Sequence, residues 1–176
     1  MKKICLTVML LAFVNLINAQ ITILDENGNV IEDGSVFVFN TVDENDNVDN
    51  PESKLNYQIQ NNTSSEIGVK AAMVEIIGSD GSNVQFCMGD CLFNVTESSV
   101  VPVAYSFPIG ANATQSVGVY LWNFNDSSDY ISYKFKVYQT DSFGNESGTP
   151  IHITYVYNAN ASVSDVNLQK LGVQVN

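Results

Sequence analysis

Tyr130-Ile-Ser-Tyr-Lys-Phe-Lys-Val-Tyr138 is the stretch that decides the fold class. Apolar and polar side chains alternate along it, and the apolar set consists of Ile131, Tyr133, Phe135 and Val137. Because successive side chains of a β-strand point to opposite faces of a sheet, this alternation predicts a strand with one buried face.

Further strand-like stretches lie on both sides of it at short intervals. They are residues 20–24, 29–31, 35–39, 54–60, 67–77, 100–107, 114–124 and 150–157. Turn residues such as Asp25-Glu-Asn-Gly28 separate them. Between the N-terminal segment and the last residues, no window has apolar residues at helical spacing. The predicted fold is all-β, an antiparallel immunoglobulin-like β-sandwich of about seven to nine strands.

Alternation also assigns faces within two of the longer stretches. In residues 67–77 it places Met73 and Glu75 on one face and Ile76 on the opposite face. In residues 114–124 it places the apolar set Val117, Val119 and Leu121 opposite the aromatic set Tyr120, Trp122 and Phe124.

The first nineteen residues have the pattern of a secretory signal peptide. Lys2 and Lys3 precede an apolar run over residues 4–14, and Ile17-Asn-Ala19 offers a cleavage site. The apolar run is too short to span about 30 Å of hydrocarbon, so we expect cleavage rather than a membrane anchor. The predicted division is a signal peptide at 1–19, a β-sandwich domain at 20–157 and a linker or C-terminal tail at 158–176.

Removal of the signal peptide leaves a strongly acidic chain. The remaining 157 residues carry five lysines, no arginine and nineteen acidic residues, a net charge of −14. Such a chain is repelled by phosphate backbones and by anionic bilayers. We therefore expect no nucleic-acid partner and no membrane insertion after cleavage.

Two cysteines remain in the exported chain, Cys87 and Cys91, within Phe86-Cys-Met-Gly-Asp-Cys-Leu-Phe93. An even pair this close in a turn of an exported protein is expected to form a disulfide. A redox motif would have two intervening residues, and a zinc site would need more ligands than the single histidine, His152. The ring closed is small, so the bond contributes only about 2 kcal/mol and fixes a local turn.

Three segments carry a resemblance to known proteins. They are Ile21-Thr-Ile-Leu-Asp-Glu-Asn-Gly-Asn-Val-Ile-Glu-Asp-Gly34, Gln85-Phe-Cys-Met-Gly-Asp-Cys91 and Phe135-Lys-Val-Tyr-Gln-Thr-Asp-Ser-Phe-Gly-Asn145. Together with the signal ending in Ala19-Gln20, they resemble small exported proteins of Bacteroidota that are cargo of the type IX secretion system. The resemblance implies the secretion machinery as a partner and a secreted or cell-surface location, reached through the periplasm.

The same resemblance bears on the end of the chain. Members usually continue, after a tail like residues 164–171, into a C-terminal sorting domain that opens with Tyr-Pro-Asn-Pro. That motif does not occur before Asn176. We expect that the sorting domain has been left off this chain; the alternative is that export ends in the periplasm.

Catalysis has little support in the sequence. His152 is the only histidine that could act as a base, and neither a Gly-x-Ser-x-Gly elbow nor a phosphate-binding glycine loop accompanies it. A carboxylate pair for glycoside hydrolysis would need a cleft and a raised pKa, which a sequence does not show. We expect a protein that is not an enzyme.

The most acidic run, Asp43-Glu-Asn-Asp-Asn47 with Asp49, is a candidate metal site. Its carboxylates Asp43, Glu44, Asp46 and Asp49 are the hard oxygen ligands that Ca²⁺ prefers. The alternative is a solvated acidic loop. Calcium is the one cofactor that the sequence suggests, and otherwise no cofactor is expected.

The aromatic set Tyr120, Trp122 and Phe124 is a candidate ligand-binding row. Aromatic rings on one face of a strand can stack on sugars, and they can equally fill the core of a sandwich. An exposed Trp122 would favour the first alternative and a buried Trp122 the second. The overall prediction is a secreted or cell-surface, non-catalytic binding or adhesion module for an unknown extracellular protein or glycan. Its rivals are a carbohydrate-binding module, with or without calcium, and a structural subunit of a surface assembly.

Overall fold

The structure is a computed structural model of the chain, and it describes residues 20–162. Its strands are β1 Ile21–Leu24, β2 Val30–Ile31, β3 Ser35–Phe39, β4 Lys54–Asn56, β5 Gln58–Asn61, β6 Ile67–Ile77, β7 Val84–Met88, β8 Asp90–Leu92, β9 Val100–Val101, β10 Phe107–Ile109, β11 Thr114–Gln115, β12 Val119–Asn123, β13 Tyr130–Thr140 and β14 Glu146–Asn158. No helix in this part of the chain has the length and hydropathy that a membrane crossing requires. The predicted signal peptide and most of the predicted tail lie outside the described residues.

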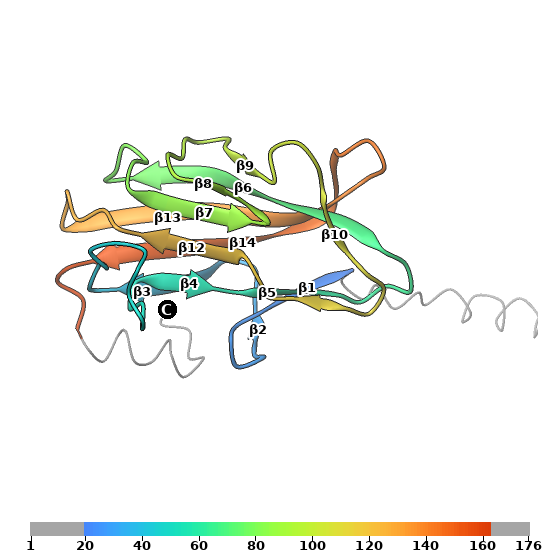
Figure 1. Cartoon of the computed structure of the whole chain (residues 1–176), viewed down its shortest axis with the longest axis horizontal. Helices are drawn as coiled ribbons and strands as arrows, with labels where there is room; N and C mark the ends of the chain where they lie inside the picture. Colours follow the sequence, from blue (N-terminus) through green and yellow to red (C-terminus); the bar gives the residue numbers. More distant parts are fainter. Residues whose placement is uncertain (1–19, 163–176) are drawn as a thin grey trace, which may run out of the picture.

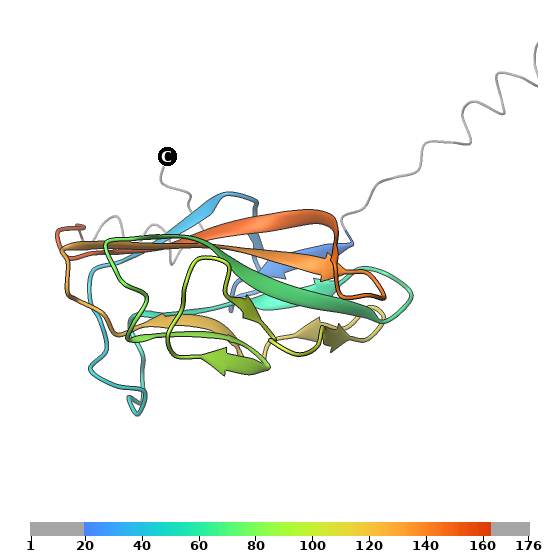
Figure 2. The ribbon, with the colours of Figure 1, turned by 90° about the horizontal axis from the view of Figure 1, so that it is seen from above.

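The strands form the two layers of a β-sandwich (Figures 1 and 2). One layer is a single sheet in the order β10-β6-β13-β14-β3, with β9 also paired to β6. The other layer contains two shorter sheets, β11-β5-β1-β2 and β4-β12-β7-β8. The prediction of an immunoglobulin-like β-sandwich is confirmed. Its pairs are antiparallel except for β14 and β3, which run parallel.

The core lies between the layers, and β13 supplies its centre. Ile131, Tyr133, Phe135 and Val137 are completely buried, as the alternation predicts. From the opposite layer, the rings of Phe86 and Tyr57 each lie 5.5 Å from the ring of Phe135, measured between centroids. The alternating strand therefore forms the middle of the core.

A β-bulge in β6 changes the faces of its second half. Lys134 of β13 pairs with Glu75, whereas the next residue, Phe135, pairs with Met73, so one residue of β6 is extra. A bulge of this kind transfers the following side chains to the other face. Ile76 consequently packs against the core and Glu75 is exposed. The prediction that Glu75 shares a face with Met73 is wrong for this reason.

A second irregularity divides the smaller layer into two sheets. The predicted strand 54–60 is interrupted at Tyr57, and the predicted strand 114–124 is interrupted between β11 and β12. Residues 116–119 lie opposite only residues 57 and 58, so the longer side bulges outward. Val117 is 79% exposed in this bulge, whereas Val119 and Leu121, which the alternation places on the same face of one strand, are buried.

Candidate functional site

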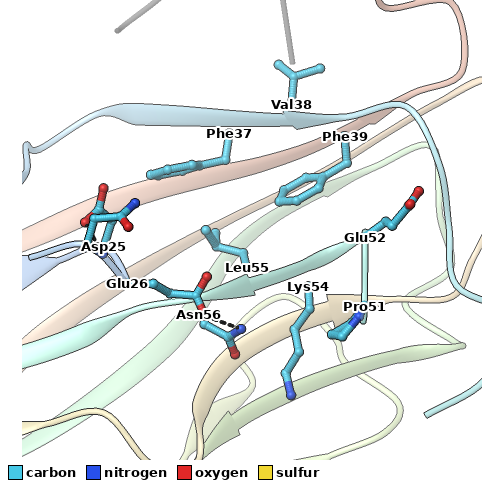
Figure 3. A pocket seen from close by; sticks show the side chains of 11 residues that line it. Asp25, Glu26, Phe37, Val38, Phe39, Pro51, Glu52, Lys54, Leu55 and Asn56 are labelled. Carbon is cyan, nitrogen blue, oxygen red and sulfur yellow. Dashed lines mark hydrogen bonds between the residues drawn. The ribbon is translucent and has the colours of Figure 1, made fainter. Parts of the chain in front are cut away.

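A groove of about 400 Å³ lies between the edge strand β3 of the large sheet and the edge strand β4 of the other layer (Figure 3). Phe37 and Phe39 project from β3 and Leu55 projects toward them from β4, so the three side chains form an apolar floor. Phe39 is held by a stacked contact with Tyr155 of the core, with ring centroids 4.5 Å apart. The floor is therefore continuous with the core and fixed by it.

The path of β1 explains why the groove is open. β1 pairs with β5 as far as Leu24, which lies opposite Gln58, and the chain then turns away at Asp25. β12 pairs with the other edge of β4, on the side of β11. β4 precedes β5 in the chain, and its groove-side edge lies beyond the end of β1. Among residues 20–162, no strand pairs with this edge of β4.

The backbone of β4 offers polar groups at this open edge. The N–H of Tyr57 donates to the carbonyl oxygen of Val119, 3.3 Å away, so Tyr57 directs its backbone groups toward the chain segment of β12. Backbone N–H groups of successive strand residues point to alternate edges. The N–H and C=O groups of Leu55 therefore also point toward β12, while those of Lys54 and Asn56 point toward the groove.

Acidic side chains lie at the Phe37 end of the groove (Figure 3). Asp25 closes its own turn, because Oδ1 accepts hydrogen bonds from the backbone N–H groups of Asn27 and Asn29, both at 2.8 Å. Glu26 Oε1 accepts a hydrogen bond from Asn56 Nδ2 at 2.9 Å. Both carboxylates are thus held beside the edge of β4.

Glu52 lies at the Phe39 end, and Asp43 fixes its backbone (Figure 3). The Asp43 carboxylate accepts hydrogen bonds from the N–H groups of Glu52 and Ser53, both 3.1 Å, and from Ser53 Oγ, 2.8 Å. It also accepts one from Trp122 Nε1 at 2.7 Å. Burial alone would raise the pKa of Asp43, and these hydrogen bonds outweigh it, so that its pKa lies below the ordinary value.

Of the basic residues within 20–162, Lys54 alone lines the groove, and its ammonium group is turned away from the floor (Figure 3). Nζ lies 3.9 Å from the centroid of the Tyr120 ring and 4.6 Å from that of Trp122, in cation–π contact. Burial lowers the pKa of Lys54, and the nearby charge of Glu26 opposes that shift. The groove is therefore apolar in the middle and acidic at both ends.

The predicted metal ligands are not brought together around one point. Asp43 is occupied by the hydrogen bonds of its own loop, Asp49 is exposed, and Glu44 and Asp46 line a separate hollow of about 260 Å³ with Phe93. Within residues 20–162, no group of three or more His, Cys, Asp or Glu side chains is arranged to hold a metal ion. The acidic run lies in the loop that joins β3 to β4.

The predicted aromatic row faces outward from the sheet β4-β12-β7-β8, on the side opposite the buried Val119 and Leu121. The ring of Trp122 lies 4.7 Å from that of Phe124 and is covered by the Asp43 loop, leaving the residue only 4% exposed. Tyr120 donates a 3.0 Å hydrogen bond to Gln85. The covered ring of Trp122 offers no open face for stacking on a sugar.

The predicted disulfide between Cys87 and Cys91 is present and joins β7 to β8. Cys91 Sγ lies 3.7 Å from the hydroxyl oxygen of Tyr120. The cystine, the aromatic row and the acidic loop thus share one face of the molecule. His152 lies elsewhere, with Nδ1 2.9 Å from Asp33 Oδ1, beside the turn between β2 and β3.

The residues of the groove were not predicted from the sequence. The sequence predicts a strand that contains Phe37 and Phe39. It does not predict that their rings line a groove. One available signal was that Ser35-Val-Phe-Val-Phe39 is apolar on both faces. A strand with only one face on the core does not need that pattern.

No protein-family model and no curated protein matches the sequence. Among solved structures, the chain is similar to the N-terminal domain of PorA, with 13% sequence identity and a TM-score of 0.47, covering 81% of this chain and 100% of that domain. It is also similar to the ASH / PapD-like domain of human CEP192 (PapD-like domain 7), with 9% identity and a TM-score of 0.41, covering 85% of this chain and 94% of that one.

Proposed function

We propose that the protein is an exported, non-catalytic binding module that holds an extracellular partner in the groove between β3 and β4. One observation carries the proposal: the open edge of β4 faces the apolar side chains of Phe37 and Phe39 across a groove of about 400 Å³. Ligand sites in proteins enclose about 300–1,000 Å³ and are mostly apolar with a few placed polar groups.

The build of the site favours recognition. Each wall is a strand whose far side is anchored, β3 by β14 and β4 by β12. The acids at the Phe37 end, Asp25 and Glu26, are engaged in hydrogen bonds that fix their positions. Preformed sites lose little conformational entropy on binding, so a rigid groove is suited to holding a partner.

Export is supported by the Cys87–Cys91 disulfide, because such bonds persist in oxidising compartments. The signal-like residues 1–19 point the same way. A non-catalytic role is supported by the position of the only histidine. His152 pairs with Asp33 beside the β2–β3 turn and does not line the groove.

The experiment is site-specific photo-crosslinking in the source organism. A benzophenone side chain replaces Asn27, which lines the groove, or Thr154 of β14 as the control. We expect adducts with one partner, identified by mass spectrometry, from position 27 and not from position 154. Absence of adducts at position 27, or the same adducts from both positions, would contradict the proposal.

A further inference from the structure

We propose that the groove takes an extended polypeptide segment with two apolar side chains at positions i and i+2 and a lysine or arginine two residues beyond each of them. The inference rests on the proposed function and names the class of partner. Its elements are the exposed backbone of β4, the spacing of the apolar floor and the placement of charge.

The open edge of β4 is suited to the addition of a strand. Lys54 and Asn56 direct their N–H and C=O groups to the groove, because Leu55 and Tyr57 direct theirs to β12. An extended segment that lies in line with β1 can pair with these groups. In recognition by strand addition, main-chain hydrogen bonds supply affinity and alternate side chains supply specificity.

The floor sets the spacing of the apolar side chains. Phe37 and Phe39 lie two residues apart on one strand, and Leu55 lies below and between them (Figure 3). Side chains at i and i+2 of an extended chain are about 6.8 Å apart on one face. Two apolar residues with that spacing in the partner can each contact one phenylalanine ring.

The acidic side chains at the ends of the groove favour basic residues on both sides of the apolar pair in the partner. Asp25 and Glu26 lie at one end of the groove and Glu52 at the other, whereas the ammonium group of Lys54 is engaged by Tyr120 and Trp122. The whole chain has a formal net charge of −12. Complementary charge speeds association and suppresses acidic competitors, so a segment with basic ends is favoured.

The probe is the synthetic peptide acetyl-Lys-Thr-Val-Thr-Val-Thr-Lys-amide, titrated by calorimetry into residues 20–176. One control peptide has Glu in place of both Lys, and a second has Ser in place of both Val. We expect saturable binding of the first peptide and affinities at least about tenfold lower for each control, equivalent to about 1.4 kcal/mol.

Protein variants distinguish binding in the groove from attraction of the basic peptide by the overall negative charge of the protein. Glu26→Gln with Glu52→Gln removes two groove charges while keeping amide oxygens for Asn56 and Thr41, the present hydrogen-bond donors. We expect this double variant to bind the basic peptide several-fold more weakly and with less dependence on salt. The matched control, Glu44→Gln with Glu66→Gln, removes equal charge outside the groove and is expected to bind as the unchanged protein does.

The outcomes separate this inference from the proposed function. If the Lys and Glu peptides bind equally, the partner class is wrong and the binding function stands. If no peptide binds while adducts still form at position 27, the groove holds another kind of partner and this inference is overturned. Two further results would overturn this inference. Peptide binding seen only after removal of residues 163–176 would assign the groove to that segment of the chain itself. Peptide binding seen only when a dimer dissociates would assign the groove to a second copy of the protein.

Discussion

Trp122 Nε1 donates a 2.7 Å hydrogen bond to Asp43 Oδ2, although the two residues are 79 positions apart in the sequence. One was predicted as a sugar-stacking ring and the other as a metal ligand, and the structure joins them in a single contact. This contact fastens the β3–β4 loop to the outer face of β12. Asp43 also accepts a hydrogen bond from the backbone N–H of Glu52. The contact with Trp122 therefore helps to position Glu52, the acid at one end of the groove.

Asp43→Asn should destabilise the protein. The amide has one acceptor oxygen where the carboxylate has two, and its NH₂ group meets the donors Trp122 Nε1 and Ser53 N–H. Loss of buried hydrogen bonds to a charged group costs about 1–3 kcal/mol. Urea denaturation followed by Trp122 fluorescence measures the change. The matched control is Asp49→Asn at an exposed position of the same loop, and equal midpoints for the two variants would contradict the structural role.

The same carboxylate predicts how stability depends on pH. The folded-state pKa of Asp43 lies below its ordinary value of 3.8. Its contribution is therefore complete above about pH 4, where the unfolded chain is also ionised, and is lost as the pH falls through the lower folded-state pKa. Denaturation midpoints between pH 7 and pH 2.5 should fall less steeply on the acid side in Asp43→Asn than in the unchanged protein. Parallel curves would show that Asp43 carries no such linkage.

Tyr57→Phe should leave stability unchanged or increase it by about 1 kcal/mol. The Tyr57 hydroxyl is buried, and no described group lies within hydrogen-bonding distance of it. A buried polar group without a partner costs free energy that its removal recovers. The control is Tyr155→Phe, which removes a hydroxyl that donates to the Ser53 carbonyl at 2.9 Å and should destabilise. A clear loss of stability in Tyr57→Phe would show that this hydroxyl has a partner.

Glycine substitutions test the tight turn between β6 and β7. Gly81 has φ +80°, and a Cβ there would overlap the carbonyl oxygen of Val95. Gly28 has φ +83° with no atom within 4 Å of the added Cβ. Gly28→Ala should cost about 1–2 kcal/mol from the left-handed backbone alone, and Gly81→Ala clearly more. Thermal unfolding of both variants decides this, and equal losses would refute the close approach to Val95.

Local alternation was sufficient to predict the strands that cross the core. Residues 130–138 have apolar side chains at every second position, as do residues 67–73 at the start of the stretch 67–77. The two stretches form the greater part of β13 and all of β6. The bulge in β6 was not predictable, because Val74, Ile76 and Ile77 supply apolar residues in either register. The break at Tyr57 likewise has no local signal, since Tyr is a favourable strand residue.

The candidate site depended on contacts that sequence order does not reveal. The disulfide was predictable because its two cysteines lie close together in the chain. The groove needs β3 to join β14 in parallel and β1 to stop at Leu24, and both follow from tertiary packing. The acids of residues 43–49 have the composition of a metal-binding loop, and composition alone does not show that Asp43 accepts hydrogen bonds from Trp122, Ser53 and Glu52.

Hydrogen exchange at β4 tests the central claim most directly. The amides of Lys54 and Asn56 point to the groove, and the amide of Leu55 points to β12 and serves as an internal control. With the basic peptide bound, we expect exchange at Lys54 and Asn56 to slow by at least about tenfold. Exchange at Leu55 should change much less. Saturating peptide that leaves Lys54 and Asn56 unchanged, or that slows exchange at β7 and β8 instead, would show that the partner does not bind at this edge.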